Sequence, residues 1–289
     1  MQAEEPDPWI KHHDKPIRNL VISGGSIGGL IVAGVWRVIE EARLNKDIVN
    51  LAGCSVGSIF ALLICLGYNA RELAVICKYF RYKDHSSLSI LGIFEQLGLE
   101  DGKNIMTLLK RLTELKAGNV EGELTFRSLF VITGRRLTVN AYCVEDDCGT
   151  VYSLQDSPDM PVLLAVRMSI AIPLVLTPVK YGGKTYVDGG LHDVFPLRMF
   201  NSAETLGIQI INRDTVFDMD EESGLIIALL KNLYKRLWTD RAELKEYRVI
   251  QVYSGVSSLS LDLSRQERKM LINKGYEAAV KKVGLGTPC

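Results

Sequence analysis

Short apolar runs alternate with longer helical patterns along the first third of the chain. Residues 18–22 form an apolar run that leads directly into a glycine-rich turn, and residues 48–52 form a second run that ends in the same way. A helical pattern follows each turn, over about residues 30–44 and then up to about residue 66. Two successive units of strand, tight turn and helix predict a parallel α/β sheet.

The rest of the chain continues this alternation. Strands are predicted at 137–144, 150–154, 176–181, 185–187, 206–211 and 248–253. Helices are predicted over most of 84–120 and at about 69–79, 160–170, 222–239 and 264–283. Asn69 with Glu72, and Ser264 with Glu267, have the spacing of a capping box, which satisfies the first backbone amides of a helix.

The same pattern predicts one domain. Residues 1–16 contain three prolines and no periodicity, which is typical of a loose N-terminal leader. Residues 17–285 contain no repeat and no long linker. We therefore expect a single three-layer α/β/α sandwich with a mainly parallel central sheet.

Composition narrows the class of protein. The chain is 47% hydrophobic and 24% charged, as an ordinary globular protein is. Lys and Arg number 34, as do Asp and Glu, so the basic excess of a nucleic-acid-binding protein is absent. Six cysteines are too few for a disulfide scaffold, no CxxC pair occurs, and we expect reduced thiols.

No segment of the sequence has the pattern of a secretory signal or of a transmembrane helix. The first 16 residues lack the basic start and apolar run of a secretory signal. The longest apolar run, Ile59 to Leu66, is far shorter than the roughly 20 residues that a transmembrane helix needs. We expect a cytoplasmic protein whose contact with membranes, if any, is peripheral.

The motif Gly53-Cys54-Ser55-Val56-Gly57 carries the clearest chemical signal. It fits the pattern G-x-S-x-G and lies where a predicted strand meets a predicted helix. That is the context of a nucleophile elbow, in which a sharp turn exposes a serine and the flanking glycines relieve crowding. The start of the following helix directs backbone amides and a positive dipole end at the serine. The alternative is a turn of small residues that only packs helix against sheet.

Two further glycine motifs stand at strand ends. The turn over residues 23–29 exposes backbone amides that can hold an oxyanion or a phosphate. A dinucleotide-binding fingerprint requires G-x-G-x-x-G, and Ser26 breaks the match that starts at Gly24, so a nucleotide-binding protein is disfavoured. Asp188-Gly189-Gly190 follows the strand at 185–187 and, taken alone, is a turn sequence.

In the order glycine turn, serine elbow and aspartate, the chain resembles the patatin-like phospholipase family over about residues 17–200. The segment from Ser169 to Pro173 is similar to the one that precedes the family's Asp-Gly motif. The resemblance implies a lipid acyl hydrolase of phospholipase A or lysophospholipase type, which acts through an acyl-serine. Its substrate would be a phospholipid or another lipid ester, and it needs no metal or other cofactor.

Site residues carry over motif by motif. The resemblance makes Ser55 the nucleophile and Asp188 its base in a Ser-Asp dyad. It places the oxyanion hole at the amides of Gly25 and Ser26, flanked by Gly24 and Gly29. Gly53, Gly57, Gly189 and Gly190 would support the two turns. Ser26 stands where the family has a third glycine, and Gly28 stands where a basic residue is frequent.

Alternatives remain at the level of the sequence. His192, four residues after Asp188, is the credible histidine for a Ser-His triad. The run Glu145-Asp146-Asp147 lacks the spacing of a calcium loop and is read as a solvated turn.

The same acyl-serine would serve an acyltransferase, and the altered turn would suit a lipid-binding protein with weak activity. Residues 87–94 fit a lid or core packing, and 222–239 fit a membrane-surface or solvated helix. The sequence does not indicate an oligomeric state.

Overall fold

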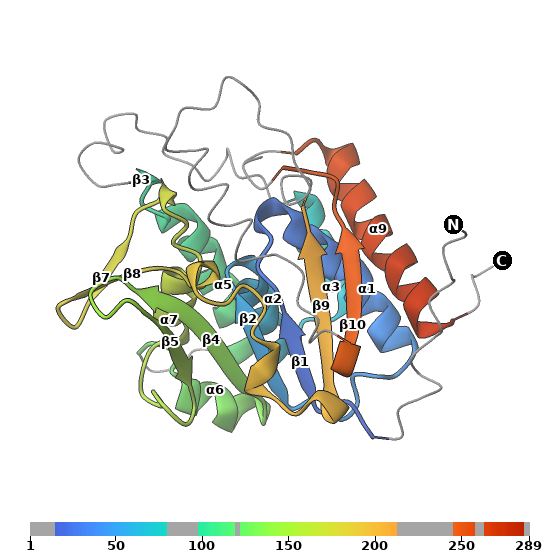
Figure 1. The fold of residues 1–289 in the computed structure, drawn as a ribbon, viewed down its shortest axis with the longest axis horizontal. Helices are drawn as coiled ribbons and strands as arrows, with labels where there is room; N and C mark the ends of the chain where they lie inside the picture. The colour runs from blue at the N-terminus through green and yellow to red at the C-terminus, as the bar shows by residue number, and fades with distance from the viewer. Residues whose placement is uncertain (1–14, 80–97, 119–121, 213–244, 258–262, 286–289) are drawn as a thin grey trace.

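A mixed β-sheet forms the centre of the computed structural model, which describes residues 15–79, 98–118, 122–212, 245–257 and 263–285. The eight strands follow the order β10-β9-β1-β2-β4-β8-β7, with β5 paired to β4 (Figure 1). They are β1 (Asn19–Ile22), β2 (Asn50–Cys54), β4 (Arg136–Cys143), β5 (Cys148–Ser153), β7 (Val179–Tyr181), β8 (Lys184–Asp188), β9 (Thr205–Ile211) and β10 (Arg248–Tyr253). A small second sheet pairs β3 (Gly98–Glu100) with β6 (Leu174–Leu176).

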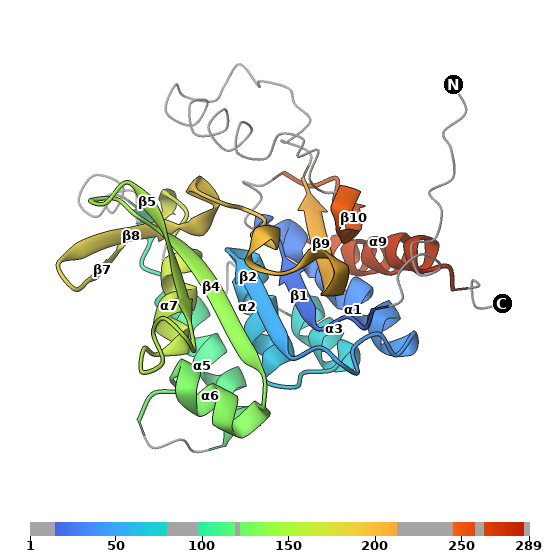
Figure 2. The same cartoon turned by 60° about the horizontal axis from the view of Figure 1, so that its bottom comes forward.

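The sheet divides into a parallel and an antiparallel part. Strands β10, β9, β1, β2 and β4 run parallel to one another, as the strand–turn–helix pattern predicts. The pairs β4–β5, β4–β8 and β7–β8 are antiparallel, and both hairpins lie at the same end of the sheet (Figure 2). Short turns join these strands: Gly182 and Gly183 have φ of 57° and 79°, which glycine adopts without strain.

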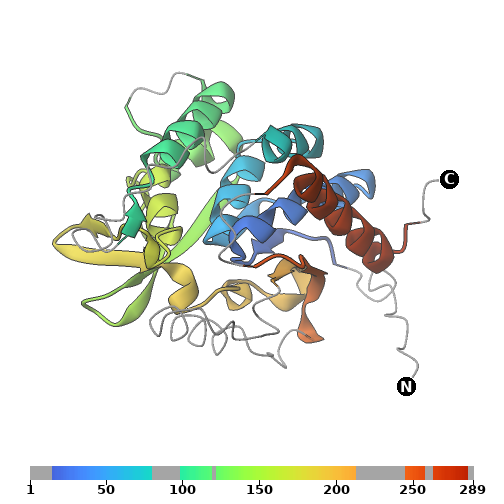
Figure 3. The same ribbon diagram turned by 90° about the horizontal axis from the view of Figure 1, so that it is seen from above.

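Helices of the described residues pack on one face of the sheet (Figure 3). They are α1 (Ile31–Glu41), α2 (Val56–Cys65), α3 (Ala70–Tyr79), α5 (Lys103–Ala117), α6 (Phe126–Thr133), α7 (Val162–Ser169) and α9 (Arg265–Val283). Short 3-10 turns are η2 (Ser26–Leu30), η4 (Gly189–Leu191), η5 (Leu197–Met199) and η6 (Ser202–Glu204). The prediction of an α/β fold built on a central sheet is confirmed, and the described helices form the layer on one of its faces.

Alternation along the strands divides the core between the two faces. Leu20 and Ile22 point to the helical face, whereas Val21 between them joins a second cluster on the opposite face. That second cluster also contains Val194 and Phe195, from the segment that follows Asp188. The segment after the Asp-Gly-Gly motif is therefore held against the sheet by apolar burial.

Helices α1 and α9 cross at two glycines. A Cβ atom at Gly34 would lie 1.9 Å from the carbonyl oxygen of Ile272, and one at Gly275 would lie 2.0 Å from that of Ile31. Because α1 begins where the glycine turn ends, this close crossing with α9 helps to fix the position of the turn.

Both predicted capping boxes are present. Asn69 and Glu72 exchange backbone-to-side-chain hydrogen bonds of 2.9 and 3.0 Å, and Ser264 and Glu267 do the same at the start of α9. The predicted strand at 176–181 is instead two strands, β6 and β7, because Pro178 cannot donate a backbone hydrogen bond between them. Helix α6 and strand β3 were not predicted. The segments 87–94 and 222–239 lie outside the described residues.

Candidate active site

Ser55 occupies a sharp turn between β2 and α2. Its φ of 52° and ψ of −130° are unusual for a residue with a side chain, as expected of a nucleophile elbow. A Cβ atom at Gly53 would lie 2.3 Å from the carbonyl oxygen of Gly57, and one at Gly57 would lie 2.3 Å from that of Ile22. Only glycine fits at either position. Both glycines therefore relieve crowding in the turn that carries Ser55.

Neighbouring groups hold the elbow in place. The backbone amide of Ser55 donates to Ser169 Oγ at 2.9 Å, and the hydroxyl of Ser58 donates to the carbonyl oxygen of Ser55 at 2.6 Å. Ser169 lies 114 residues away in the sequence, at the end of α7. Ser55 also lines a pocket.

Asp188 reaches the same place from the antiparallel part of the sheet. It ends β8 and pairs with Ala141 of β4, while Cys54, the residue before Ser55, pairs with Asn140 of the same strand. A single strand thus brings Ser55 and Asp188 together. Asp188 is 1% exposed, and its Oδ1 accepts a hydrogen bond of 2.7 Å from the amide of Gly190. Its Oδ2 is buried and has no hydrogen-bond partner among the described residues.

Burial sets the acidity of this carboxyl group. Desolvation raises the pKa of Asp188 from 3.8 to about 7, while the nearby hydroxyl of Ser55 and the amide of Gly190 oppose the rise. An aspartate with an ordinary pKa is a poor proton acceptor from a serine, whereas one with a pKa near 7 has the basicity that general base catalysis at neutral pH requires.

The glycine turn lies against the elbow. A Cβ atom at Gly24 would lie 3.4 Å from Ser55 Cβ, and one at Gly29 would lie 2.6 Å from Cγ2 of Val56, just after the serine. The amide of Gly24 is engaged, since it donates to the carbonyl oxygen of Val194 at 2.9 Å. Gly24 and Gly29 therefore have a steric role here. Among the hydrogen bonds between described residues, none has the backbone amide of Gly25 or Ser26 as donor.

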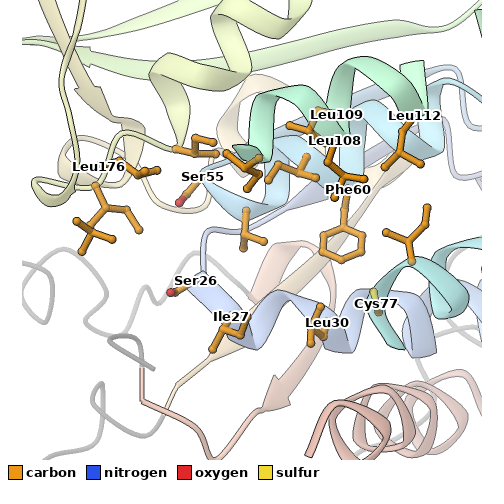
Figure 4. A pocket seen from close by; sticks show the side chains of 17 residues that line it. Ser26, Ile27, Leu30, Ser55, Phe60, Cys77, Leu108, Leu109, Leu112 and Leu176 are labelled. Carbon is orange, nitrogen blue, oxygen red and sulfur yellow. The ribbon is translucent and has the colours of Figure 1, made fainter. Parts of the chain in front are cut away.

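Ser26 carries backbone strain. Its φ of 48° lies in the left-handed region, which favours glycine. The side chain lines the same pocket as Ser55 (Figure 4). The sequence therefore departs from glycine at a position where the backbone conformation favours it, and the turn still forms.

A pocket of about 150 Å³ opens in front of Ser55. Figure 4 shows Ser55 and Ser26 at one side, with Phe60, Cys77 and Leu112 deeper along it. Apart from two hydroxyls and one thiol, the side chains that line it are hydrocarbon. The lining residues are Ser26, Ile27, Leu30, Ser55, Val56, Ile59, Phe60, Ile76, Cys77, Ile105, Leu108, Leu109, Leu112, Ile170, Ile172, Val175 and Leu176.

His192 lies against the β4–β5 hairpin. A Cβ atom at Gly149 would meet His192 Cδ2 at 2.1 Å, so this glycine makes room for the imidazole ring. No hydrogen bond found among the described residues joins the His192 ring to Ser55 or Asp188.

Asn140 is a buried polar residue of the site that sequence reasoning did not single out. Its Nδ2 donates to the carbonyl oxygen of Asp193 at 2.7 Å, which ties β4 to the segment after Asp188. A Cβ atom at Gly189 would lie 2.5 Å from the carbonyl oxygen of Asn140. An asparagine within the apolar run of the 137–144 strand was the available signal.

The acidic run makes local contacts. Glu145 accepts from the amide of Thr185 at 2.6 Å, Asp146 pairs with Lys184 at 2.5 Å, and Asp147 accepts from the hydroxyl of Tyr142. The described cysteines, Cys54, Cys65, Cys77, Cys143 and Cys148, are free. No described helix has both the length and the hydropathy that crossing a membrane requires.

The α/β fold, the serine elbow and the glycine turn together define a class. The chain belongs to the patatin-like phospholipase family, whose model matches residues 20–201. It is 26% identical over 273 residues to a protein named "Probable lipid hydrolase 463L" from Invertebrate iridescent virus 6, with 92% of this chain and 88% of that protein covered. It is 30% identical over 212 residues to the uncharacterized protein YqhO of Bacillus subtilis, covering 67% of this chain and 71% of YqhO.

Solved structures share the fold at low sequence identity. VipD from Legionella pneumophila matches with a TM-score of 0.60 at 16% identity, covering 93% of this chain and 67% of VipD. The type III effector protein ExoU matches with a TM-score of 0.55 at 14% identity and covers 94% of this chain. This chain spans about half of the ExoU chain, 53%.

Proposed function

We propose that this protein is a metal-independent lipid acyl hydrolase of phospholipase A or lysophospholipase type, in which Ser55 is the nucleophile and Asp188 the base. The observation that carries the proposal is the meeting of three features at one point. A serine on a strained elbow lies beside a buried carboxyl group with a pKa of about 7, and the same serine lines an apolar pocket.

The reaction follows from these positions. Ser55 Oγ attacks the ester carbonyl carbon as its proton passes to the Asp188 carboxylate. The tetrahedral intermediate collapses, the carbon–oxygen bond to the alcohol breaks, and the protonated Asp188 returns its proton to the leaving alkoxide. Water then attacks the acyl-serine, Asp188 accepts a proton from that water, and the fatty acid leaves as Ser55 regains its proton.

The oxyanion would be held by the amides of Gly25 and Ser26 and by the start of α2. Donors of this kind contribute roughly 3 to 4 kcal/mol each in related enzymes, because they are already oriented when the charge develops. The amide of Gly24 is bound to Val194, which leaves the two following amides as donors. The N-terminal end of α2 adds the positive end of a helix dipole.

The lining of the pocket favours a substrate with an acyl chain. A lining of leucine, isoleucine and phenylalanine offers no partner for a polar group but favours a hydrocarbon chain, at about 25 cal/mol for each Å² of apolar surface that leaves water. A phospholipid, a lysophospholipid or a neutral lipid ester presents such a chain next to a carbonyl group.

Fatty-acid release tests the proposal. Mixed vesicles of phospholipid and lysophospholipid would be incubated in EDTA with wild type, Ser55→Ala and Asp188→Asn. The matched control is Ser202→Ala, in the half-buried 3-10 turn η6 directly before β9. We expect release by wild type and by the control, and loss in both site variants. Equal release by Ser55→Ala would refute the proposal, and no release by a folded wild type would favour a lipid-binding protein with weak activity.

A further inference from the structure

A chain of hydrogen bonds runs from α9 to the glycine turn. Asn212, directly after β9, is fully buried, and its Nδ2 donates to the carbonyl oxygen of Gly25 at 2.8 Å. Its Oδ1 accepts from the hydroxyl of Ser254, directly after β10, at 2.7 Å. Lys274 of α9 in turn donates to the carbonyl oxygen of Ser254 at 2.9 Å.

The chemistry of the partners fixes which way the Asn212 amide group faces. A backbone carbonyl oxygen only accepts, so the NH₂ group must face Gly25. The Ser254 hydroxyl can then donate to the remaining amide oxygen. The asparagine is thus held at both ends, and the carbonyl group of Gly25 has a donor that points straight at it.

Fixing this carbonyl group also fixes the next amide. The chain has no cis peptide bond among its described residues, and a trans peptide is planar, with its C=O and N–H on opposite sides. When the carbonyl oxygen of Gly25 faces Asn212, the N–H of Ser26 faces the other way. Ser26 lines the pocket beside Ser55 (Figure 4).

We infer that Asn212 is a positioning residue for the proposed reaction: it holds the Gly25–Ser26 peptide so that the Ser26 amide points at the developing oxyanion. This inference rests on the proposed function. It also explains how a strained, non-glycine residue is kept in a conformation with a φ of 48°. A peptide that is not tied at its carbonyl oxygen would be free to rotate and relieve that strain.

The side chain of Asn212 is closely packed. A Cβ atom at Gly28 would lie 2.2 Å from Asn212 Oδ1, and one at Gly25 would lie 2.5 Å from Cγ2 of Ile210. Gly28 is not among the glycines with positive φ, so its backbone allows alanine. Its methyl group would therefore act by pushing the Asn212 amide away from Gly25. This provides a second route to the same perturbation.

The test compares kcat and KM for a soluble short-chain ester in wild type, Asn212→Ala, Asn212→Asp, Gly28→Ala and the double variant Gly28→Ala/Asn212→Ala. Asn212→Asp keeps the shape and, once ionised, has no hydrogen to donate. The matched control is Gln251→Ala, which removes an exposed side-chain amide from β10.

We expect kcat to fall roughly 10- to 100-fold in Asn212→Ala and Asn212→Asp, short of the roughly 10²- to 10³-fold loss when an oxyanion donor is removed outright. KM should stay within about twofold, because the amide acts in the transition state. Gly28→Ala should lower kcat in wild type but add nothing in the Asn212→Ala background, since the group it displaces is already gone.

Two controls distinguish failure of this inference from failure of the proposed function. Ser254→Ala keeps Asn212 but removes the hydrogen bond that its Oδ1 accepts, so a smaller loss of kcat is expected even if Asn212→Ala does not fold. Wild-type kcat in a folded Asn212→Asp, or additive losses in the double variant, would overturn the inference while Ser55→Ala remained inactive. Activity in Ser55→Ala would instead overturn the proposed function on which it rests.

Discussion

The charge of Asp188 is costly to the folded state, and this cost can be measured. Raising its pKa from 3.8 to about 7 corresponds to about 4 kcal/mol, at about 1.36 kcal/mol for each pKa unit. The folded protein holds the proton more tightly than the unfolded chain does. The contribution to stability is therefore full below the unfolded pKa, and it is lost as pH rises through the folded pKa.

Asp188→Asn removes this pH dependence, because the amide has no proton to release. The amide oxygen still accepts from Gly190, but its NH₂ group replaces an Oδ2 that has no partner among the described residues, which costs about 1–3 kcal/mol at every pH. Between about pH 5 and about pH 8, the free energy of unfolding of the variant should rise by about 2.7 kcal/mol relative to that of wild type. Wild type loses this much stability because about two pH units of the interval lie below its folded-state pKa.

Denaturant unfolding at several pH values would measure this difference, and kcat/KM would be followed over the same range for wild type. We expect an acidic limb in wild-type kcat/KM centred near pH 7, because the proposed reaction uses the ionised form of Asp188 as its base. A stability difference that does not change with pH, together with a flat rate profile between about pH 4 and about pH 8, would refute a raised pKa.

Three further predictions follow from the site. His192→Ala should keep kcat/KM within about threefold of wild type, while Asp188→Asn loses roughly 10³-fold or more, since the His192 ring packs on the β4–β5 hairpin; the reverse pattern in steady-state rates would indicate a histidine triad. Ser26→Gly should raise the free energy of unfolding by about 0.5 kcal/mol, because relief of about 1–2 kcal/mol of left-handed strain exceeds the entropy that glycine loses, and a drop of about 1 kcal/mol would show that Ser26 is unstrained. Because Cys77 lines the pocket, Cys77→Phe should lower kcat/KM at least about tenfold for long-chain esters and leave that for short-chain esters unchanged. Val75→Phe, on the exposed side of α3, should change neither, and an unchanged chain-length profile in Cys77→Phe would place the acyl chain elsewhere.

Local patterns were enough to predict much of the fold. Each predicted strand–turn–helix unit formed because a short apolar run, a glycine turn and a helical period agree about the same residues. Helix α6 was not predicted because its capping box pairs Thr125 with Ser128, where the usual signature has Glu or Gln at the third helical position. Pro178 was the available signal for the break between β6 and β7.

The site was predictable only where a motif is local. Ser55 and Asp188 stand in short motifs whose steric needs can be stated from the residue types. Asn212 lies 187 residues from the Gly25 carbonyl oxygen that it contacts, and sheet order alone brings them together. The apolar pocket has the same origin, since its walls come from segments far apart in the chain whose packing no single stretch of sequence encodes.

Identifying the residue that becomes acylated tests the central claim most directly. The protein would be reacted with a fluorophosphonate and, separately, quenched in acid during turnover of a long-chain ester, and its peptides would then be mapped by mass. We expect both the phosphonyl and the acyl adduct on Ser55, and neither adduct in Ser55→Ala. An adduct on another residue, or equal labelling of Ser55→Ala, would contradict it.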